Sequence, residues 1–362
     1  MHTLTMESKV RQPSNAFALC CASLIALVSM GACTRAAVPA AAPAPALGAQ
    51  LQAQTIVDVD ALLAAVKELK EAAPAPTGRG WDATQDAAAL AKARDAWKRA
   101  RAAYERIEGV LAPLFPDIDS ALDERFDGAM ELLLPKGDTN LFDDQGFVGM
   151  HAVERILFAP ETRAAVIAHE REAFKNKGYV AAAWPKSQEE AAGFKTLLCA
   201  QLIKDVESLR TVWTPQNMDT QGAYDGLEGL VAEQREKVSN AASSEEESRY
   251  ANVTLADLRS NLEGLERAFS VFKSAIAKRS ESKETLLGIE ASFARLHALY
   301  KQFPGDAVPE APATFAAEAP SAADLESDFG KLWKGVTTEV DLKNPQGLLV
   351  LVQNARVWAV VP

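Results

Sequence analysis

Apolar residues recur every three or four positions along almost the whole chain from about residue 51 onward. This spacing places them on one face of an α-helix, and no run of alternating β-branched residues competes with it. The pattern therefore predicts an all-α protein. The segments expected to be helical are residues 59–72, 86–115, 149–158, 187–213, 226–241, 253–280, 283–303 and 322–340, with 348–361 left between helix and strand because it is rich in β-branched residues.

Proline, serine and a break in the pattern divide these helices. Prolines end several of them, and Ser187 followed by acidic residues marks a helix start with an N-cap. The stretch 213–222, WTPQNMDTQG, interrupts the helical pattern. We therefore expect two consecutive four-helix bundles, an N-terminal one over residues 51–215 and a C-terminal one over residues 216–362. Residues 303–321 are rich in proline and alanine and are expected to form a long loop.

The first 32 residues have the character of a secretory signal peptide. Lys9 and Arg11 precede an apolar run over residues 17–32. Sequence rich in alanine and proline follows, rather than a stop-transfer pattern. We expect residues 1–32 to be removed on export.

The four residues from Met30 to Cys33, MGAC, resemble the lipobox of bacterial lipoproteins, in which small residues precede the lipidated cysteine. We expect Cys33 to carry the lipid, with ordinary cleavage near residues 36–37 as the alternative. Residues 33–50 then hold the lipidated cysteine and a flexible linker, because a stretch of alanine and proline cannot bury a core. The expected location is the periplasmic side of a bacterial membrane, with the choice of outer or inner membrane left open.

The composition limits the partners. The net charge is -11, and an acidic surface disfavours phosphate backbones, so we expect no nucleic-acid partner. Cys20 and Cys21 lie in the signal peptide, which leaves Cys199 as the lone cysteine of the helical body. Cys199 stands in an apolar helical pattern and is expected to be a small buried core residue.

His151 and Glu154 stand one helical turn apart in the apolar segment GFVGMHAVERILF, residues 146–158. An imidazole and a carboxylate at i and i+3 share one helix face and are good ligands for zinc or a transition metal. A metal site in a bundle draws its other ligands from a facing helix. The alternative is a core histidine whose hydrogen bonds are satisfied within the protein.

Acidic residues that could face this pair gather on both sides of the turn at residues 115–116. Glu105 and Glu108 are again spaced i, i+3, and a buried carboxylate needs a cation or a hydrogen-bonded partner. A solvated acidic helix face is the alternative for each nearby aspartate. These aspartates are Asp117, Asp119, Asp123 and Asp127. Three arginines of the same region could also neutralise the carboxylates, namely Arg99, Arg101 and Arg106.

Motifs of known enzyme classes are scarce. The segment HAVER resembles the zinc-protease pattern HxxEH, but Arg155 replaces the second histidine and so removes a metal ligand. His169 and His297 are the other histidines of the helical body. The sequence contains no HExxH, no glycine-rich phosphate loop and no G-x-S-x-G elbow.

Three motifs follow one another between residues 97 and 154. They are W-x3-R-x2-YE-x-IE-x-V, then FPDID-x3-DER, then GMHAVE, which contains the pattern GxHxxE. In this order they resemble the imelysin-like family and, within it, the iron-uptake group called EfeO and EfeM. Residues 248–276 and 286–300 resemble the second half of that group. The resemblance covers roughly residues 51–305.

The resemblance implies an exported protein of two helical bundles that binds iron or a similar metal outside the cytoplasmic membrane. It implies metal-binding roles for residues that match the family motifs, with Asp119 as a weaker substitute for Asp123. These residues are His151, Glu154, Glu105, Glu108 and Asp123. The implied partners are the metal ion itself, a membrane iron permease or peroxidase, and the membrane that holds the lipid anchor.

The chain departs from the pattern of this group in two places. Residues 34–50 are a tether rather than a cupredoxin-like domain, so the short EfeM-like form is expected. The segment YANVTLADL, residues 250–258, lacks the histidine that the group carries there. If this region contacts the metal site, the affinity or the choice of metal will differ from that of the group.

We therefore expect an exported metal-binding lipoprotein of an iron-uptake system that captures a cation without catalysis. Carboxylate-rich ligation favours iron, with zinc and copper as alternatives. Binding should weaken at acid pH because the ligands must be deprotonated. Two other functions are kept as alternatives: an imelysin-type metallopeptidase, and a surface module for a non-metal ligand. The second of these needs a basic groove lined by Arg99, Arg101, Arg106 and Arg155.

Overall fold

The computed structural model describes residues 46–360, apart from 124–125, 127, 129, 131–136, 138–139 and 176–177. The predicted signal peptide, Cys33 and most of the predicted linker lie outside these residues, as does Asp127. Every regular element within the described residues is a helix, so the expected all-α fold is confirmed. None of these helices combines the length and the apolar composition needed to cross a membrane.

The chain alternates long helices with short ones. The part before residue 215 contains α1 (Leu47–Ala72), α2 (Ala87–Glu105), α3 (Glu108–Leu114), α4 (Pro116–Leu122), α6 (Met150–Leu157), α7 (Ala164–Ala173), α8 (Gln188–Gly193) and α9 (Cys199–Val212). The part after it contains α10 (Thr220–Asn240), α11 (Thr254–Ile276), α12 (Lys283–Lys301), α13 (Ala322–Glu326), α14 (Asp328–Val340) and α15 (Leu348–Ala359).

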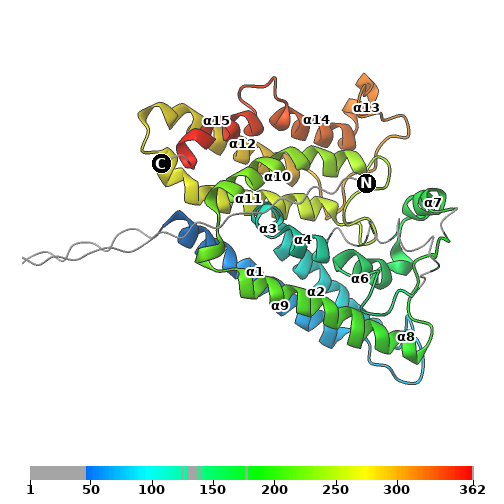
Figure 1. Ribbon diagram of the computed structural model, residues 1–362. Helices are drawn as coiled ribbons and strands as arrows, with labels where there is room; N and C mark the ends of the chain where they lie inside the picture. The colour runs from blue at the N-terminus through cyan, green and yellow to red at the C-terminus, as the bar shows by residue number, and fades with distance from the viewer. Residues whose placement is uncertain are drawn as a thin grey trace, which may run out of the picture. The chain divides into compact units, whose positions relative to one another are not determined.

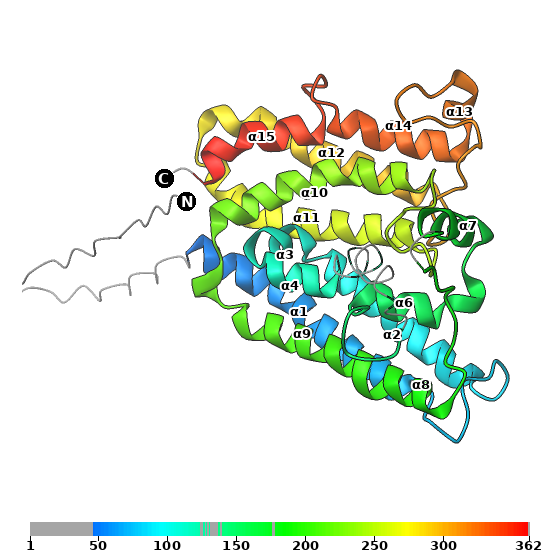
Figure 2. The ribbon, with the colours of Figure 1, turned by 45° about the vertical axis from the view of Figure 1, so that its right-hand side comes forward.

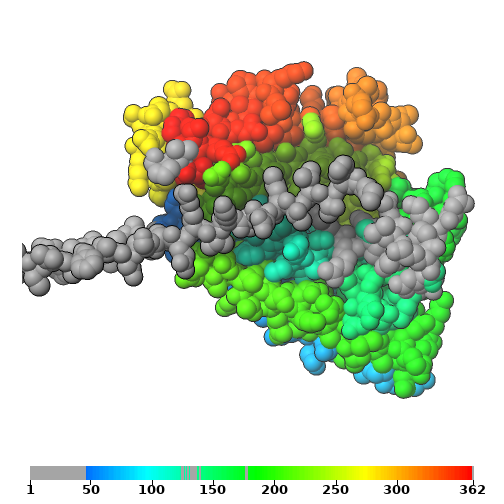
Figure 3. Space-filling model, viewed as in Figure 1, coloured from blue at the N-terminus to red at the C-terminus, as the bar shows by residue number. Residues whose placement is uncertain are grey.

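The long helices pack side by side as two groups, with α10 and α11 between them (Figure 1). Helix α1 packs on α2 and α9, while α12 packs on α14 and α15. Helices α10 and α11 lie between these two groups and contact α3, as both ribbon views show (Figure 2). On the face in Figure 3, α14 and α15 form one edge and α9 the opposite edge. The described helices belong to one compact unit, and the division into two bundles at residue 215 stays a prediction.

Two buried tryptophans fix the positions of helices around α1 and α2. Trp97 Nε1 donates to the main-chain oxygen of Met150 at 3.0 Å and so ties α2 to α6. Trp213 Nε1 donates to Thr55 Oγ1 at 3.0 Å and ties the end of α9 to α1. A buried indole needs a partner for its N–H, so each contact combines apolar burial with a specific orientation.

The single helix expected over residues 86–115 is wrong, because the chain breaks it between Glu105 and Glu108. Asn261 Nδ2 donates to the main-chain oxygen of Glu105 at 2.9 Å, which gives this carbonyl a partner outside the helix. Gly264 lies against the break, where an added Cβ would lie only 2.2 Å from the main-chain oxygen of Arg106. Helix α11 therefore packs against the break between α2 and α3.

Other segments agree with the expected pattern more closely. Ser187 caps α8 by accepting a hydrogen bond from the backbone of Glu190 at 3.2 Å, as expected. The ambiguous segment 348–361 contains helix α15, and residues 303–321 contain no helix. Several boundaries differ: α1 already begins at Leu47, α10 begins at Thr220 rather than at residue 226, and Ser327 divides the expected helix 322–340 by capping α14. Helices α4 and α7 lie outside the segments expected to be helical.

Cys199 is the free cysteine of the described chain, and it is fully buried in the core. Burial raises the pKa of its thiol to about 12, so the reactive thiolate is rare at neutral pH. We expect a fragment of residues 45–362 to react with a thiol reagent at pH 8 only after denaturant is added. Rapid labelling of the native fragment, followed by absorbance, would contradict this burial.

Candidate metal centre

Gly149 sets the start of the helix that carries His151 and Glu154. Its φ of 94° lies in the left-handed region that favours glycine, and an added Cβ would lie 2.8 Å from the main-chain oxygen of Leu122. Helix α6 begins at the next residue and runs through the interior. His151 and Glu154 are consequently 6% and 0% exposed.

Glu154 contacts the imidazole of His151 at Nδ1, the ring nitrogen that does not face Asp123. Glu154 Oε2 lies 2.8 Å from His151 Nδ1. The other carboxylate oxygen, Oε1, accepts hydrogen bonds from the backbone N–H groups of Tyr250 at 3.0 Å and Ala251 at 2.8 Å. With Nδ1 engaged, His151 Nε2 faces Asp123 Oδ1 at 3.2 Å. Such a carboxylate behind a histidine fixes the orientation of the ring and raises its basicity.

Asp123 lies between His151 and Arg101, and Arg101 Nη1 pairs with the same carboxylate oxygen. Burial alone would raise the pKa of Asp123, but Arg101 and His151 outweigh it and hold that pKa below its usual range. Burial alone would lower the pKa of His151, but Asp123 and Glu154 raise it to about 10. The imidazole therefore carries a proton at neutral pH, and a metal bound at Nε2 would release it.

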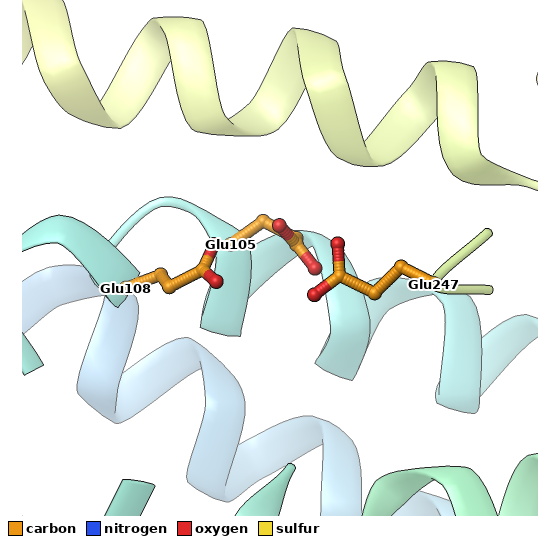
Figure 4. A group of neighbouring side chains, drawn as sticks. All are labelled: Glu105, Glu108 and Glu247. Carbon is orange, nitrogen blue, oxygen red and sulfur yellow. The ribbon is translucent and has the colours of Figure 1, made fainter. Parts of the chain in front are cut away.

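Figure 4 shows three carboxylates gathered at one place, those of Glu105, Glu108 and Glu247. Glu105 ends α2, Glu108 begins α3, and Glu247 comes from the loop between α10 and α11. One oxygen of each lies within 4.8 Å of the others. Within the described ranges, no other group of three metal-ligating side chains is this close. We call these residues the glutamate trio.

Lys237 of α10 contacts all three members of the trio. Its Nζ lies 2.7 Å from Glu247, 2.8 Å from Glu108 and 3.2 Å from Glu105. The lysine side chain is 4% exposed, so these ion pairs are shielded from water. Buried carboxylates need such a partner, because an unpaired buried charge is costly.

Arg101 and Asn261 complete the contacts of the trio. Arg101 pairs with Glu105 and lies 2.8 Å from Glu247 Oε1. Asn261 Nδ2 donates to Glu105 Oε2 at 2.7 Å and to Glu108 Oε2 at 2.8 Å. Burial nevertheless raises the pKa of Glu108 to about 8 and that of Glu105 well above its usual value. The trio thus has room for more positive charge than its neighbours supply.

A cavity of about 420 Å³ opens next to these residues, and His151 and Lys237 form part of its wall. Seven carboxylates line it against two cationic side chains, Lys237 and Arg249. These acids are Glu108, Asp119, Asp123, Glu233, Glu236, Glu245 and Glu247. A single imidazole among many carboxylate oxygens suits iron or a similar hard to borderline cation better than a soft metal.

The structure brings the five predicted metal residues into one network with two parts. His151, Glu154 and Asp123 form one part, and Glu105 and Glu108 belong to the other. Arg101 joins the parts, because it pairs with both Asp123 and Glu105. Of the other acidic candidates, Asp119 accepts a hydrogen bond from Tyr104 at 2.6 Å and Asp117 is exposed.

Sequence reasoning missed Glu247, Lys237, Glu233 and Asn261. Lys237 had a usable signal, because it continues the buried stripe Leu230, Val231, Gln234 and Val238 of α10. A charged residue on a buried helix face needs a charged partner, so it indicates an internal site. Glu247 lies in the run SSEEES, where Glu245 is exposed and Glu246 is buried, and nothing local indicates which acid reaches the site.

Arg155, which replaces the second histidine of the zinc-protease pattern, points into a different cluster. Its Nη2 lies 3.0 Å from Glu170 Oε2 and donates to the main-chain oxygen of Val180 at 2.6 Å. His297 pairs with Glu266 at 3.0 Å, and His169 lies 3.5 Å from Glu245 at the cavity wall. Among the described residues, His151 is therefore the one histidine of the HxxE site.

The arginines proposed for a basic groove have separate partners. Arg99 pairs with Glu68 at 2.9 Å, Arg106 pairs with Asp58 at 2.6 Å, and Arg155 pairs with Glu170. These three belong to different ion pairs, and the fourth, Arg101, is buried in the acidic network. The four residues do not form one groove.

Comparisons with known proteins agree with this architecture. A sequence model of the imelysin family, Peptidase M75, matches residues 47–327. A crystal structure of an imelysin-like protein from Psychrobacter arcticum 273-4 superposes with a TM-score of 0.52 at 14% identity, covering 86% of this chain and 90% of that one. At this identity the likeness concerns the fold.

Curated relatives carry a functional description. The iron uptake system component EfeO of Escherichia coli strain K12 is 24% identical over 214 residues, and EfeO of Shigella flexneri has the same identity. The match covers 59% of this chain and 45% of each relative, so the chain spans just under half the length of these proteins.

Proposed function

The chain belongs to the imelysin family, and from this premise we propose that it binds iron as a component of an iron-uptake system. The observation that carries the proposal is the open cavity in which one imidazole faces a surplus of carboxylates. The iron-uptake relatives support the same reading. The ion is cargo in this proposal, so the protein has to capture it and later release it.

The proposed roles follow from the contacts. In the proposal, His151 offers Nε2 and Asp123 offers a carboxylate oxygen on one side of Arg101, and the glutamate trio, whose oxygens lie within 4.8 Å of one another, offers ligands on the other. Glu154 orients His151 through Nδ1 and ties it to the backbone of residues 250–251. Segment 250–258 thus contacts the site through its backbone, although it lacks the histidine of the related group. Zinc and copper remain the alternative metals.

The proposed setting is the periplasmic side of a bacterial membrane. Residues 1–32 would be removed and Cys33 lipidated, and the tether would end before Leu47, where α1 begins, rather than at residue 50. A membrane iron permease or peroxidase would receive or prepare the ion, as the description of the relatives as uptake components suggests.

Replacement of His151 by alanine tests the site directly. We expect anaerobic calorimetric titration of residues 45–362 with Fe²⁺ to show near-stoichiometric binding, and His151→Ala to weaken it by about 10–100-fold or more. The reason is that the variant loses the single imidazole of the cavity.

His297→Ala is the matched control, because His297 is 43% exposed and pairs with Glu266 away from the cavity wall. Its affinity should equal that of the wild type. Equal weakening by both variants, or no Fe²⁺ binding by the wild type, would refute the proposed site. Parallel titrations with Zn²⁺ and Cu²⁺ rank the metals.

A further inference from the structure

We propose that Lys237 is a built-in counter-cation that holds the glutamate trio in the metal-free protein and is displaced toward Glu233 when the metal enters. The inference rests on the proposed function and goes beyond it, because it names the group that sets the affinity. Binding and release of the metal would then both depend on the movement of Lys237 out of and back into the glutamate trio.

The position of the ammonium group is the first support. Lys237 Nζ lies within 3.2 Å of a carboxylate oxygen of Glu105, Glu108 and Glu247. Because these oxygens lie within 4.8 Å of one another, one cation can contact all three. The ammonium group therefore occupies the point where the trio best accommodates positive charge.

The charge balance is the second support. The four acids Glu105, Glu108, Glu247 and Asp123 face three cations, which are Arg101, Lys237 and the protonated imidazole of His151. Exchange of a single positive charge for a divalent ion would bring this buried network closer to neutrality. A further buried acid, Asp257, has an oxygen without a hydrogen-bond partner among the described residues and lies in the field of Glu105 and Glu247. Burial, together with these glutamates, raises the pKa of Asp257 well above its usual value, which disfavours its charged form.

The third support is that Lys237 has another carboxylate within reach, whereas Arg101 is held in its position by its contacts. Glu233 lies one turn earlier on α10, 3.8 Å from Lys237 Nζ, and its side chain is 40% exposed on the same cavity. A lysine is a compact charge on a flexible stem, so it can swing between carboxylates. Arg101 is held by three carboxylates and lies 4.9 Å from the ring centre of Tyr104.

The consequence is that the protein binds the metal more weakly than the same ligands would bind it without Lys237 among them. If Lys237 occupies the trio for nine tenths of the time, the apparent affinity falls about tenfold, because binding is scaled by the fraction of molecules whose site is open. Removal of the competitor should restore this factor. Return of the ammonium group would likewise help the ion to leave on delivery.

Lys237→Met tests this competition, because methionine keeps an unbranched stem and removes the charge. We expect anaerobic Fe²⁺ titration of residues 45–362 to show about tenfold tighter binding than in the wild type. The metal-free variant should melt at a lower temperature, because the trio loses a counter-charge, and saturating Fe²⁺ should reverse most of this loss. Unchanged or weaker binding by a folded Lys237→Met variant would overturn the inference.

Glu233→Gln provides a second test that does not disturb the core. It removes the acceptor for the displaced lysine, so Fe²⁺ binding should weaken several-fold in the wild type and stay unchanged in a Lys237→Met background. Glu236→Gln, on the same cavity wall, is the control and should have no such dependence on Lys237. Equal effects of Glu233→Gln in both backgrounds would overturn the displacement route.

These outcomes separate the inference from the proposed function. Binding by the wild type that Lys237→Met does not strengthen leaves iron binding intact and overturns the role of Lys237. Binding by Lys237→Met alone overturns the displacement of Lys237, because the metal then does not move the lysine, and it also overturns capture of the ion by the wild type. Absence of binding in both proteins overturns the inference together with the metal site.

Discussion

Replacement of Arg101 by leucine is expected to lower the free energy of unfolding by about 3–5 kcal/mol, the cost of removing one partner from a buried ion-pair network. Arg101 is fully buried and pairs with Glu105, Asp123 and Glu247. Its loss leaves these carboxylates in a low-dielectric interior with Lys237 as the main remaining cation. Urea unfolding of residues 45–362, followed by circular dichroism at neutral pH, measures the effect.

Arg99→Leu is the matched control for this change. Arg99 lies on the same helix but is 49% exposed, and it pairs with Glu68 and Asp95 at the surface. Exposed ion pairs contribute about 0–1 kcal/mol, so the control should unfold close to the wild type. If both variants lose the same small amount, the network around Arg101 does not stabilise the fold.

Gly264→Ala is expected to destabilise the protein by about 3 kcal/mol, at the upper end of the range for overpacking. The new Cβ would lie 2.2 Å from the main-chain oxygen of Arg106 and 2.7 Å from its carbonyl carbon and its Cα. These are backbone atoms, so no side-chain rotation can relieve the contact. The break between α2 and α3 would have to shift, and Glu105 and Glu108 with it, so Fe²⁺ binding should weaken as well.

Gly229→Ala serves as the control for the backbone effect of alanine in a helix. Gly229 lies within α10, and an added Cβ there would meet no atom within 4 Å. Alanine is the better helix former by about 1 kcal/mol, so this variant should be slightly more stable than the wild type. Thermal unfolding of the two variants side by side should give shifts of opposite sign. A tolerated Gly264→Ala would show that α11 does not pack against the break as described.

The helical periodicity was sufficient to predict the all-α fold, because apolar spacing within a helix is a local property. The break between Glu105 and Glu108 has no such local signal. Its causes, Asn261 and Gly264, come from α11, and Asn261 stands 156 residues after Glu105. Propensity within residues 86–115 favours continuous helix, so the tertiary contact overrides it.

In the candidate site, too, the residues marked by a local sequence pattern could be predicted, and those brought in by distant contacts could not. His151 and Glu154 could be singled out because an i, i+3 pair in an apolar segment is unusual for polar residues. The structure adds that Glu154 binds His151 and the backbone of Tyr250 rather than facing the cavity. Glu247 reaches the trio from a loop, and no periodicity marks which acid of an acidic run turns inward. The metal roles of all these residues stay predictions.

The network that joins Glu105 to Lys237 has a consequence for the order of events during synthesis. These two residues are 132 positions apart, and Glu154 meets Tyr250 across 96 positions. Contacts of such high sequence separation form late, because the chain entropy of closing large loops opposes them. A nascent chain that ends before residue 237 has neither the lysine nor Glu247. The candidate site is therefore assembled only after these distant contacts have formed, and in the proposed function the metal binds after that assembly.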